Sequence, residues 1–273
     1  MQVFKDYASY YDLLYQDKDY ELETNYIINL IQEYGDWILN PVFAQGYDGH
    51  RQVQDDNKIL ELGSGTGKHA ILLAQKGYKL FGLDYSQEMV YISKNRLNKY
   101  ENLKEIVNFA CADVRNFNLN QKFNIILSLF HVVNYMQTDK DLLNMFTNVF
   151  KHLNKNGLFI FDIWYGPAVI AQGLENRTKN IENNLLKLTR VATPEHHKEK
   201  NIVDVNYEIL LNDKISKQNY SFKEKHTVRY LFKPELEILL NKVGLKIVNC
   251  EEFVTKCEPS EKTWGVCIVA KKV

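Results

Sequence analysis

A glycine-rich loop stands out among the residues whose types and spacing could do chemistry. The segment Glu61-Leu62-Gly63-Ser64-Gly65-Thr66-Gly67 places three glycines at alternate positions after an acid. Glycines let the backbone turn tightly and approach a ligand closely, and the N-terminus of a following helix offers unpaired N–H groups. The loop therefore predicts a site for a nucleotide-like cofactor; a purely structural turn is the alternative. Its GxGxG spacing differs from the GxGxxG of dinucleotide-binding proteins.

Two acids follow at the ends of the next two predicted strands. Asp84 is placed to accept hydrogen bonds from ribose hydroxyls, and Asp113, beside the Val114 backbone, to meet an adenine amino group. Considered without the other residues, Asp84 could also be a helix N-cap or turn residue, and Asp113 could also begin a turn. Because the carboxyl ends of parallel strands meet at one edge of a sheet, both acids should line the same pocket as the loop.

The elements that must hold these residues alternate in type. Strands are predicted over 58–62, 78–84, 106–113, 123–130 and 158–162, and helices over 20–34, 68–77, 87–99 and 139–153. The apolar run 123–130 suits a strand covered on both faces. The alternation predicts an α/β, Rossmann-like fold with right-handed crossovers, a mostly parallel sheet and helices on both faces.

The pattern changes after Asp162. Apolar and polar residues alternate over 185–191, 202–210 and 220–232, which predicts antiparallel strands laid over the core. A helix over 233–243 and a hairpin of strands 245–254 and 264–271 follow. We divide the chain into an N-terminal helical lid and insertion (1–57), a cofactor-binding core (58–165), an antiparallel substrate-binding cap (166–232) and a final helix and hairpin that complete the core (233–273).

The composition of the chain limits the kinds of binding partner that we expect. Lys+Arg and Asp+Glu balance at 34 each, so the chain has no overall positive field to gather nucleic acid or acidic lipid. The N-terminus lacks the pattern of a secretory signal and no apolar run is long enough for a membrane span, which favours a cytoplasmic protein. We expect a monomer or a homodimer. The four cysteines form no CxxC pair, so we expect reduced thiols and no metal, although a hairpin could bring Cys250, Cys257 and Cys267 together.

Taken together, Glu61, the glycine loop, Asp84 and Asp113 resemble class I S-adenosylmethionine-dependent methyltransferases, whose fold adds the final antiparallel hairpin to a seven-stranded sheet. More narrowly, the segments 11–15, 18–20, 130–135 and 226–230 look like those of bacterial sugar-modifying methyltransferases, such as the N,N-dimethyltransferases that complete desosamine and mycaminose. Three features depart from that pattern. Tyr135 stands where those enzymes have a histidine, His131 stands where they have a small residue, and the segment 40–57 has no counterpart.

The resemblance implies S-adenosylmethionine as the cofactor and assigns each site residue a role. The cofactor contacts are Tyr15, Tyr20, Glu61, Gly63, Ser64, Gly65, Gly67, Asp84, Tyr85, Met89, Asp113, Val114 and Leu129. His131 and Tyr11 belong to the catalytic centre, and Trp164, Tyr165, His226, Arg229 and Tyr230 contact substrate. Alternatives stay open for three sets: the tyrosines could pack a helix on the core, His131 could be a loop histidine bonded to backbone, and Arg229 could form a surface ion pair instead of binding a diphosphate.

The expected function is methyl transfer to a hydroxyl or amine of a small polar acceptor, a nucleotide-linked sugar in surface polysaccharide or glycoside biosynthesis. His131 would be the general base for a hydroxyl. No nucleic-acid or membrane partner is expected. The alternatives are a methyltransferase of another small metabolite, such as an amine or hydroxy acid, a nicotinamide oxidoreductase, and a non-catalytic nucleotide-binding protein.

Overall fold

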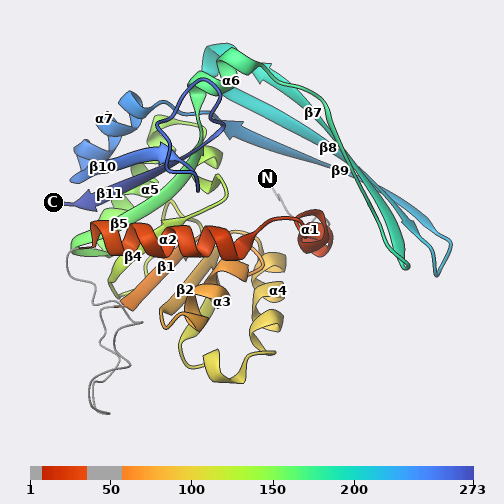
Figure 1. Ribbon diagram of the computed structural model, residues 1–273, viewed down its shortest axis with the longest axis horizontal. Helices are drawn as coiled ribbons and strands as arrows, with labels where there is room; N and C mark the ends of the chain where they lie inside the picture. Colours follow the sequence, from red (N-terminus) through yellow and green to blue (C-terminus); the bar gives the residue numbers. More distant parts are fainter. Residues whose placement is uncertain (1–7, 36–56) are drawn as a thin grey trace.

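A seven-stranded sheet forms the centre of the computed structural model, which describes residues 8–35 and 57–273 (Figure 1). Its strand order is β10-β11-β5-β4-β1-β2-β3. The strands are β1 (Lys58–Leu62), β2 (Lys79–Asp84), β3 (Val107–Cys111), β4 (Phe123–Ser128), β5 (Leu153–Trp164), β10 (Leu245–Glu252) and β11 (Gly265–Lys272). The first five pair in parallel, and β11 runs antiparallel to both β5 and β10. The predicted fold class, including the terminal hairpin, is confirmed.

Helices cover both faces of this sheet. One face holds α2 (Tyr20–Tyr34), α3 (Lys68–Gln75) and α4 (Gln87–Leu97), and the other holds α5 (Asp139–His152) and α7 (Lys233–Val243). On α2, the side chains of Ile27, Leu30 and Ile31 recur at helical spacing and are completely buried, each worth about 1.5–3 kcal/mol of burial free energy. Every residue of β4 is buried, as expected for a strand with helices on both sides.

Side-chain caps begin three of the helices. Asp19 accepts from the Leu22 N–H at the start of α2, Ser86 from the Met89 N–H at α4, and Thr138 from the Asp141 N–H at α5. Such caps satisfy backbone donors that have no partner within the helix. They explain why these helices begin within a residue of their predicted starts.

A second sheet of four antiparallel strands extends away from the core. Its order is β6 (Arg177–Glu182), β7 (Leu186–His197), β8 (Ile202–Asp213) and β9 (Asn219–Arg229), and we call it the cap. The short helix α1 (Ala8–Leu14) lies between the cap and the core (Figure 1). Leu14 packs there against Ile181, Leu188 and Ile209. The helix α6 (Gly166–Gln172) and the 3-10 turns η3 (Glu101–Leu103), η4 (Val132–Tyr135) and η5 (Lys198–Lys200) complete the described elements.

The structure differs from the sequence prediction in a few elements. β5 begins at Leu153, earlier than predicted, while α6 and β6 were not predicted. β6 buries Ile181 alone, which is too little to produce an alternating signal. Within the predicted lid, α2 packs on the core sheet and α1 on the cap, whereas residues 40–56 of the predicted insertion lie outside the described part. All four cysteines are free thiols. Among the described helices, none is long and apolar enough to cross a membrane.

Candidate cofactor and acceptor site

The glycine loop and Asp84 are in direct contact at the carboxyl edge of the core sheet. The Gly65 N–H donates to Asp84 Oδ2 at 2.8 Å, and the Ser86 N–H donates to Oδ1 at 2.9 Å. Gly63 has φ +71°, and a Cβ on it would lie 2.3 Å from Val132 Cγ2, so only glycine fits. Gly65, at φ +53°, has no atom within 4 Å of the same position. The loop therefore faces open space where a ligand can approach the backbone.

Glu61 is a buried acid at the base of this loop. Its side chain is 2% exposed, and its Oε2 has no hydrogen-bond partner in the described part of the chain. Burial, together with the negative charge of Asp84, raises the pKa of Glu61 to about 8. Ser64 Oγ is likewise buried without a partner among the described residues. Unsatisfied acceptors beside open space suit a polar ligand that carries positive charge, which S-adenosylmethionine does.

Two side chains that line the same pocket, Lys18 and His69, are joined through Glu23. His69 Nε2 lies 2.9 Å from Glu23 Oε2, and Glu23 Oε1 lies 2.7 Å from the Lys18 ammonium. The ammonium sits 4.0 Å from the centre of the Phe130 ring. Burial lowers the pKa of His69 despite the neighbouring Glu23. Sequence analysis missed Lys18, Glu23 and His69 as site residues because they come from the α1–α2 connection, α2 and α3, with no shared spacing.

The other predicted cofactor residues differ in exposure. Met89, Val114 and Leu129 are buried, whereas Tyr85 is 59% exposed at the end of β2. Tyr20 packs its ring 4.9 Å from that of His69. Gly67, with φ +77°, begins α3.

Asp113 lies after β3 and is held by a neighbouring arginine. The Arg115 guanidinium donates to Asp113 Oδ1 through Nε at 2.9 Å and to Oδ2 through NH2 at 2.6 Å. These hydrogen bonds hold the pKa of Asp113 below its ordinary value. Arg115 also contacts Asp141 at 3.0 Å, which helps to fix the guanidinium in place. A ligand at Asp113 would therefore share the carboxylate oxygens with the Arg115 guanidinium.

His131 is held by a buried aspartate that sequence analysis did not assign. The backbone N–H of His131 donates to Asp162 Oδ1 at 3.0 Å, and the ring Nδ1 of His131 lies 2.9 Å from Oδ2. Asp162 is 2% exposed near the end of β5; burial acts to raise its pKa, but the contacts with His131 lower it below its ordinary value. The contact at Nδ1 leaves Nε2 as the ring nitrogen directed away from Asp162. The sequence did contain a signal for this role, because Asp162 is the last residue of the predicted strand 158–162 and so lies at the carboxyl edge of the sheet.

The backbone that carries His131 is strained. Phe130 and His131 have φ +66° and +64°, consecutive left-handed conformations that non-glycine residues rarely adopt. Such strain costs about 1–3 kcal/mol per residue and concentrates at functional sites. The Phe130 ring lies 5.8 Å from the His131 ring, 6.3 Å from Tyr11 and 5.0 Å from Tyr15, so both predicted tyrosines reach the neighbourhood of His131.

The predicted substrate residues divide into two groups. Trp164 lies with its ring 6.3 Å from that of His131, and His226 Nδ1 is 2.6 Å from the Tyr135 hydroxyl, on the cap side of the same region. The second group has structural contacts instead. Tyr165 packs on the main core cluster, and Tyr230 is 1% exposed with its hydroxyl 3.1 Å from His196 Nε2.

Arg229 also belongs to the second group. Its guanidinium lies between Asp139, at 2.7 Å, and Glu235, at 3.1 Å. The sequence analysis gave such an ion pair as the alternative to diphosphate binding. The two carboxylates compensate the charge of the guanidinium. The diphosphate expected at Arg229 therefore has no support from its surroundings.

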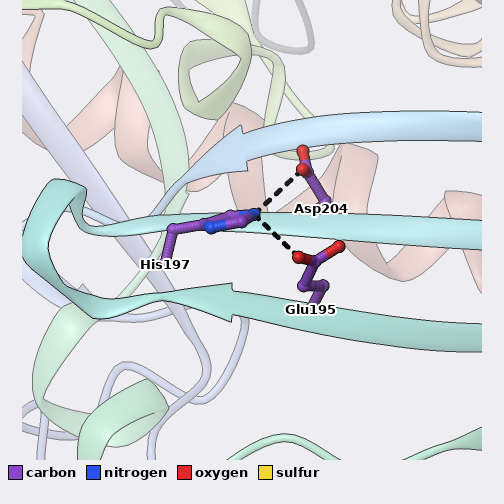
Figure 2. Close-up of side chains that lie close together, drawn as sticks. All are labelled: Glu195, His197 and Asp204. Carbon is purple, nitrogen blue, oxygen red and sulfur yellow. Dashed lines mark hydrogen bonds and ion pairs between the residues drawn. The ribbon is translucent and has the colours of Figure 1, made fainter.

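Three potential metal ligands meet on the outer face of the cap (Figure 2). His197 Nε2 lies 3.0 Å from Asp204 Oδ2 and 3.7 Å from Glu195 Oε1. The Lys225 ammonium is 2.6 Å from the same Asp204 oxygen, and Thr227 donates to the other. Because a lysine already compensates the central carboxylate, we assign no metal to this trio.

Comparison with known proteins agrees with this geometry. Residues 59–157 match the family model of a methyltransferase domain. The Bacillus subtilis protein YqeM is 22% identical over 271 residues, covering 99% of this chain and 97% of that protein. The Streptomyces venezuelae dTDP-3-amino-3,4,6-trideoxy-alpha-D-glucopyranose N,N-dimethyltransferase is 25% identical over 170 residues, covering 62% of this chain and 61% of that enzyme. A solved S-adenosylmethionine-dependent methyltransferase from Clostridium acetobutylicum superimposes with a TM-score of 0.76 at 24% identity, covering 96% and 95% of the two chains.

The fold is that of the class I S-adenosylmethionine-dependent methyltransferases. With this domain match and this fold, the protein is an S-adenosylmethionine-dependent methyltransferase.

Proposed function

We propose that this methyltransferase acts on the amino group of a nucleotide-linked sugar. The observation that carries the proposal is the Glu61–Gly65 pocket, whose wall includes Phe130, the residue directly before His131. The Streptomyces venezuelae relative supports the acceptor class, since its name describes N,N-dimethylation of a dTDP-linked amino sugar. Such an acceptor fits glycoside or surface polysaccharide biosynthesis in the cytoplasm.

The cofactor-side residues have distinct tasks in this proposal. Glu61 faces the positive charge, Asp84 accepts from ribose hydroxyls, and Asp113 accepts from the adenine amino group. Bound S-adenosylmethionine supplies an electrophilic methyl group on its sulfonium. Lys18 and Lys68, which line the pocket, offer ammonium groups to the carboxylate of the cofactor's methionine part.

The chain's contribution to the transfer is mostly orientation. The acceptor nitrogen must lie in line behind the methyl carbon; its lone pair forms the N–C bond while the S–C bond breaks, and ordering of this kind can lower the barrier by about 7–11 kcal/mol. The amine proton passes to His131 Nε2, with Asp162 holding the opposite side of the ring. Tyr11, near Phe130, closes this side of the pocket.

A hydroxyl acceptor is the second candidate, and the His131–Asp162 contact is the observation that favours it. A hydroxyl near its ordinary pKa needs a general base within about 3 Å, whereas a neutral amine needs only a route for its proton. A histidine held by a buried carboxylate is suited to act as such a base, which supports the hydroxyl candidate.

Product analysis separates these candidates. The purified protein is incubated with S-adenosylmethionine and a matched pair of dTDP-sugars that differ only in an amino or hydroxyl group, alongside simple amines and hydroxy acids. We expect S-adenosylhomocysteine and an N-methylated sugar from the amino compound. Turnover with amines or hydroxy acids alone would instead assign another small metabolite, and cofactor binding without transfer to any acceptor would contradict the proposal.

A further inference from the structure

A row of polar side chains crosses the inner face of the cap. Lys179 on β6, Arg190 on β7, Tyr207 on β8, and Glu224 and His226 on β9 form this row, which we call the polar belt. Strand alternation puts them on the face that also carries Leu188, Ile209 and Val205. The belt thus lies on the side of the cap that packs against α1 and the core.

Apolar clusters border the belt on both sides. Toward the hairpin tips, Ile181, Leu188, Ile209 and Leu211 pack with Leu14 of α1. Toward the core, the cluster contains Val169, Ala192, Val203, Val205, Val228 and Tyr230. An uninterrupted apolar face would bury more nonpolar area, so a diagonal line of polar residues that crosses all four strands needs another explanation.

The positive end of the belt is a pair of like charges. Lys179 and Arg190 are directly opposite each other in the β6–β7 register, an arrangement that destabilises a sheet unless an anion compensates it. Asp17, in the turn after α1, supplies that anion: its carboxylate lies 2.6 and 2.8 Å from the Lys179 ammonium. The hydrogen bond from Lys179, aided by the charge of Arg190, holds the pKa of Asp17 below its ordinary value.

Aromatic contacts connect the belt to the reacting centre. Arg190 donates to the Tyr15 hydroxyl at 3.1 Å, and the Tyr15 ring lies 5.0 Å from that of Phe130, which precedes His131. At the other end of the belt, His226 Nδ1 lies 2.6 Å from the Tyr135 hydroxyl of η4. Between the two ends, the Arg190 guanidinium and His226 ring lie 5.2 and 5.0 Å from the Tyr207 ring.

We infer that the polar belt binds the acceptor, and that Lys179 and Arg190 hold its diphosphate linkage by displacing the Asp17 carboxylate. The inference rests on the proposed function, since a nucleotide-linked sugar brings this anion. Arginine and lysine together suit it, because the guanidinium binds phosphate oxygens in bidentate geometry and the ammonium adds a point charge. The Glu224–His226 end then faces the part of the acceptor that carries the amino group. Arg190 thereby takes the role expected of Arg229.

Binding of a nucleoside diphosphate without a sugar tests the subsite directly. We would titrate dTDP into the full-length protein by calorimetry for Arg190→Gln, Lys179→Gln and Asp17→Asn. The first two variants should weaken dTDP binding about 10- to 100-fold each, as expected for loss of a charge-assisted hydrogen bond. Asp17→Asn, an exposed change, should strengthen it, because the competing anion is removed.

The matched control is Lys223→Gln, an exposed lysine on the outer face of β9. It should bind dTDP as the wild type does. Unchanged dTDP affinity in both Arg190→Gln and Lys179→Gln, or weaker binding in Asp17→Asn, would overturn the subsite.

A second comparison keeps this inference separate from the proposed function. If the wild type methylates an amino sugar without a diphosphate as efficiently as its dTDP-linked form, the subsite fails and sugar methylation stands. If dTDP binds through Arg190 and Lys179 but no sugar is methylated, the subsite stands and the proposed function fails.

Discussion

Replacement of Glu61 by glutamine should remove a proton-linked component of cofactor binding. The pKa of Glu61 is about 8 against an ordinary 4.5, so at pH 7 the protonated form outnumbers the ionised form by about ten to one. A cofactor that brings positive charge beside this carboxyl favours its ionised form. Up to about 0.9 proton should then leave per cofactor bound at pH 7, and affinity should rise up to about tenfold per pH unit until pH 8, above which it levels off.

The same acid makes the unliganded fold sensitive to pH. Its folded pKa is raised, so between pH 4.5 and about 8 the folded chain retains a proton that the unfolded chain has lost, and stability falls as the pH rises. The difference of about 3.5 pKa units corresponds to roughly 5 kcal/mol once the pH exceeds 8. Glu61→Gln lacks this loss, so above pH 8 the unliganded variant should melt at a higher temperature than the wild type.

Calorimetry in buffers of different ionisation enthalpy measures the released proton directly. Titrations of S-adenosylmethionine into wild type, Glu61→Gln and Ser64→Ala would cover about pH 6 to 9, the range around the Glu61 pKa. Ser64→Ala is the matched control, because it changes a neighbouring buried oxygen that does not titrate. Equal proton release in wild type and Glu61→Gln would refute the reasoning, as would wild-type binding without any release.

Three further results are expected. If the acceptor is a hydroxyl, His131→Ala should lower kcat about 10²- to 10⁴-fold with unchanged cofactor affinity, and Asp162→Asn should shift the pH profile of kcat, both measured by S-adenosylhomocysteine release; normal turnover and a normal profile with that acceptor would reject the base assignment. Gly65→Ala should fold but bind the cofactor at least about tenfold more weakly in the same calorimetry, because a Cβ there enters the open space at a strained φ of +53°; wild-type affinity would contradict this. Arg229→Ala should lower the melting temperature by several degrees, through loss of about 1–3 kcal/mol of partly buried ion pairs, while the KM for the acceptor stays unchanged; a raised KM with normal stability would restore its substrate role.

Much of the fold was available from sequence because local chemistry decided it. The apolar run of β4, the caps at Asp19 and Thr138, and the alternation of strand and helix each depend on neighbours along the chain. Even the contact between Gly65 and Asp84 was predictable, since parallel strands bring their carboxyl ends to one edge. β6 was missed because it buries only one side chain.

The tertiary structure decided how side chains from distant segments combine. Asp162 became the partner of His131 only when β5 came to lie beside β4, and Arg229 was compensated only when the end of β9 approached α5 and α7. The like-charge pair of Lys179 and Arg190 follows from the β6–β7 register, and its anion from the turn after α1. Residue spacing sets which elements form and which edge of the sheet binds a ligand. Pairings between side chains far apart in sequence depend on register and packing, which no local pattern encodes.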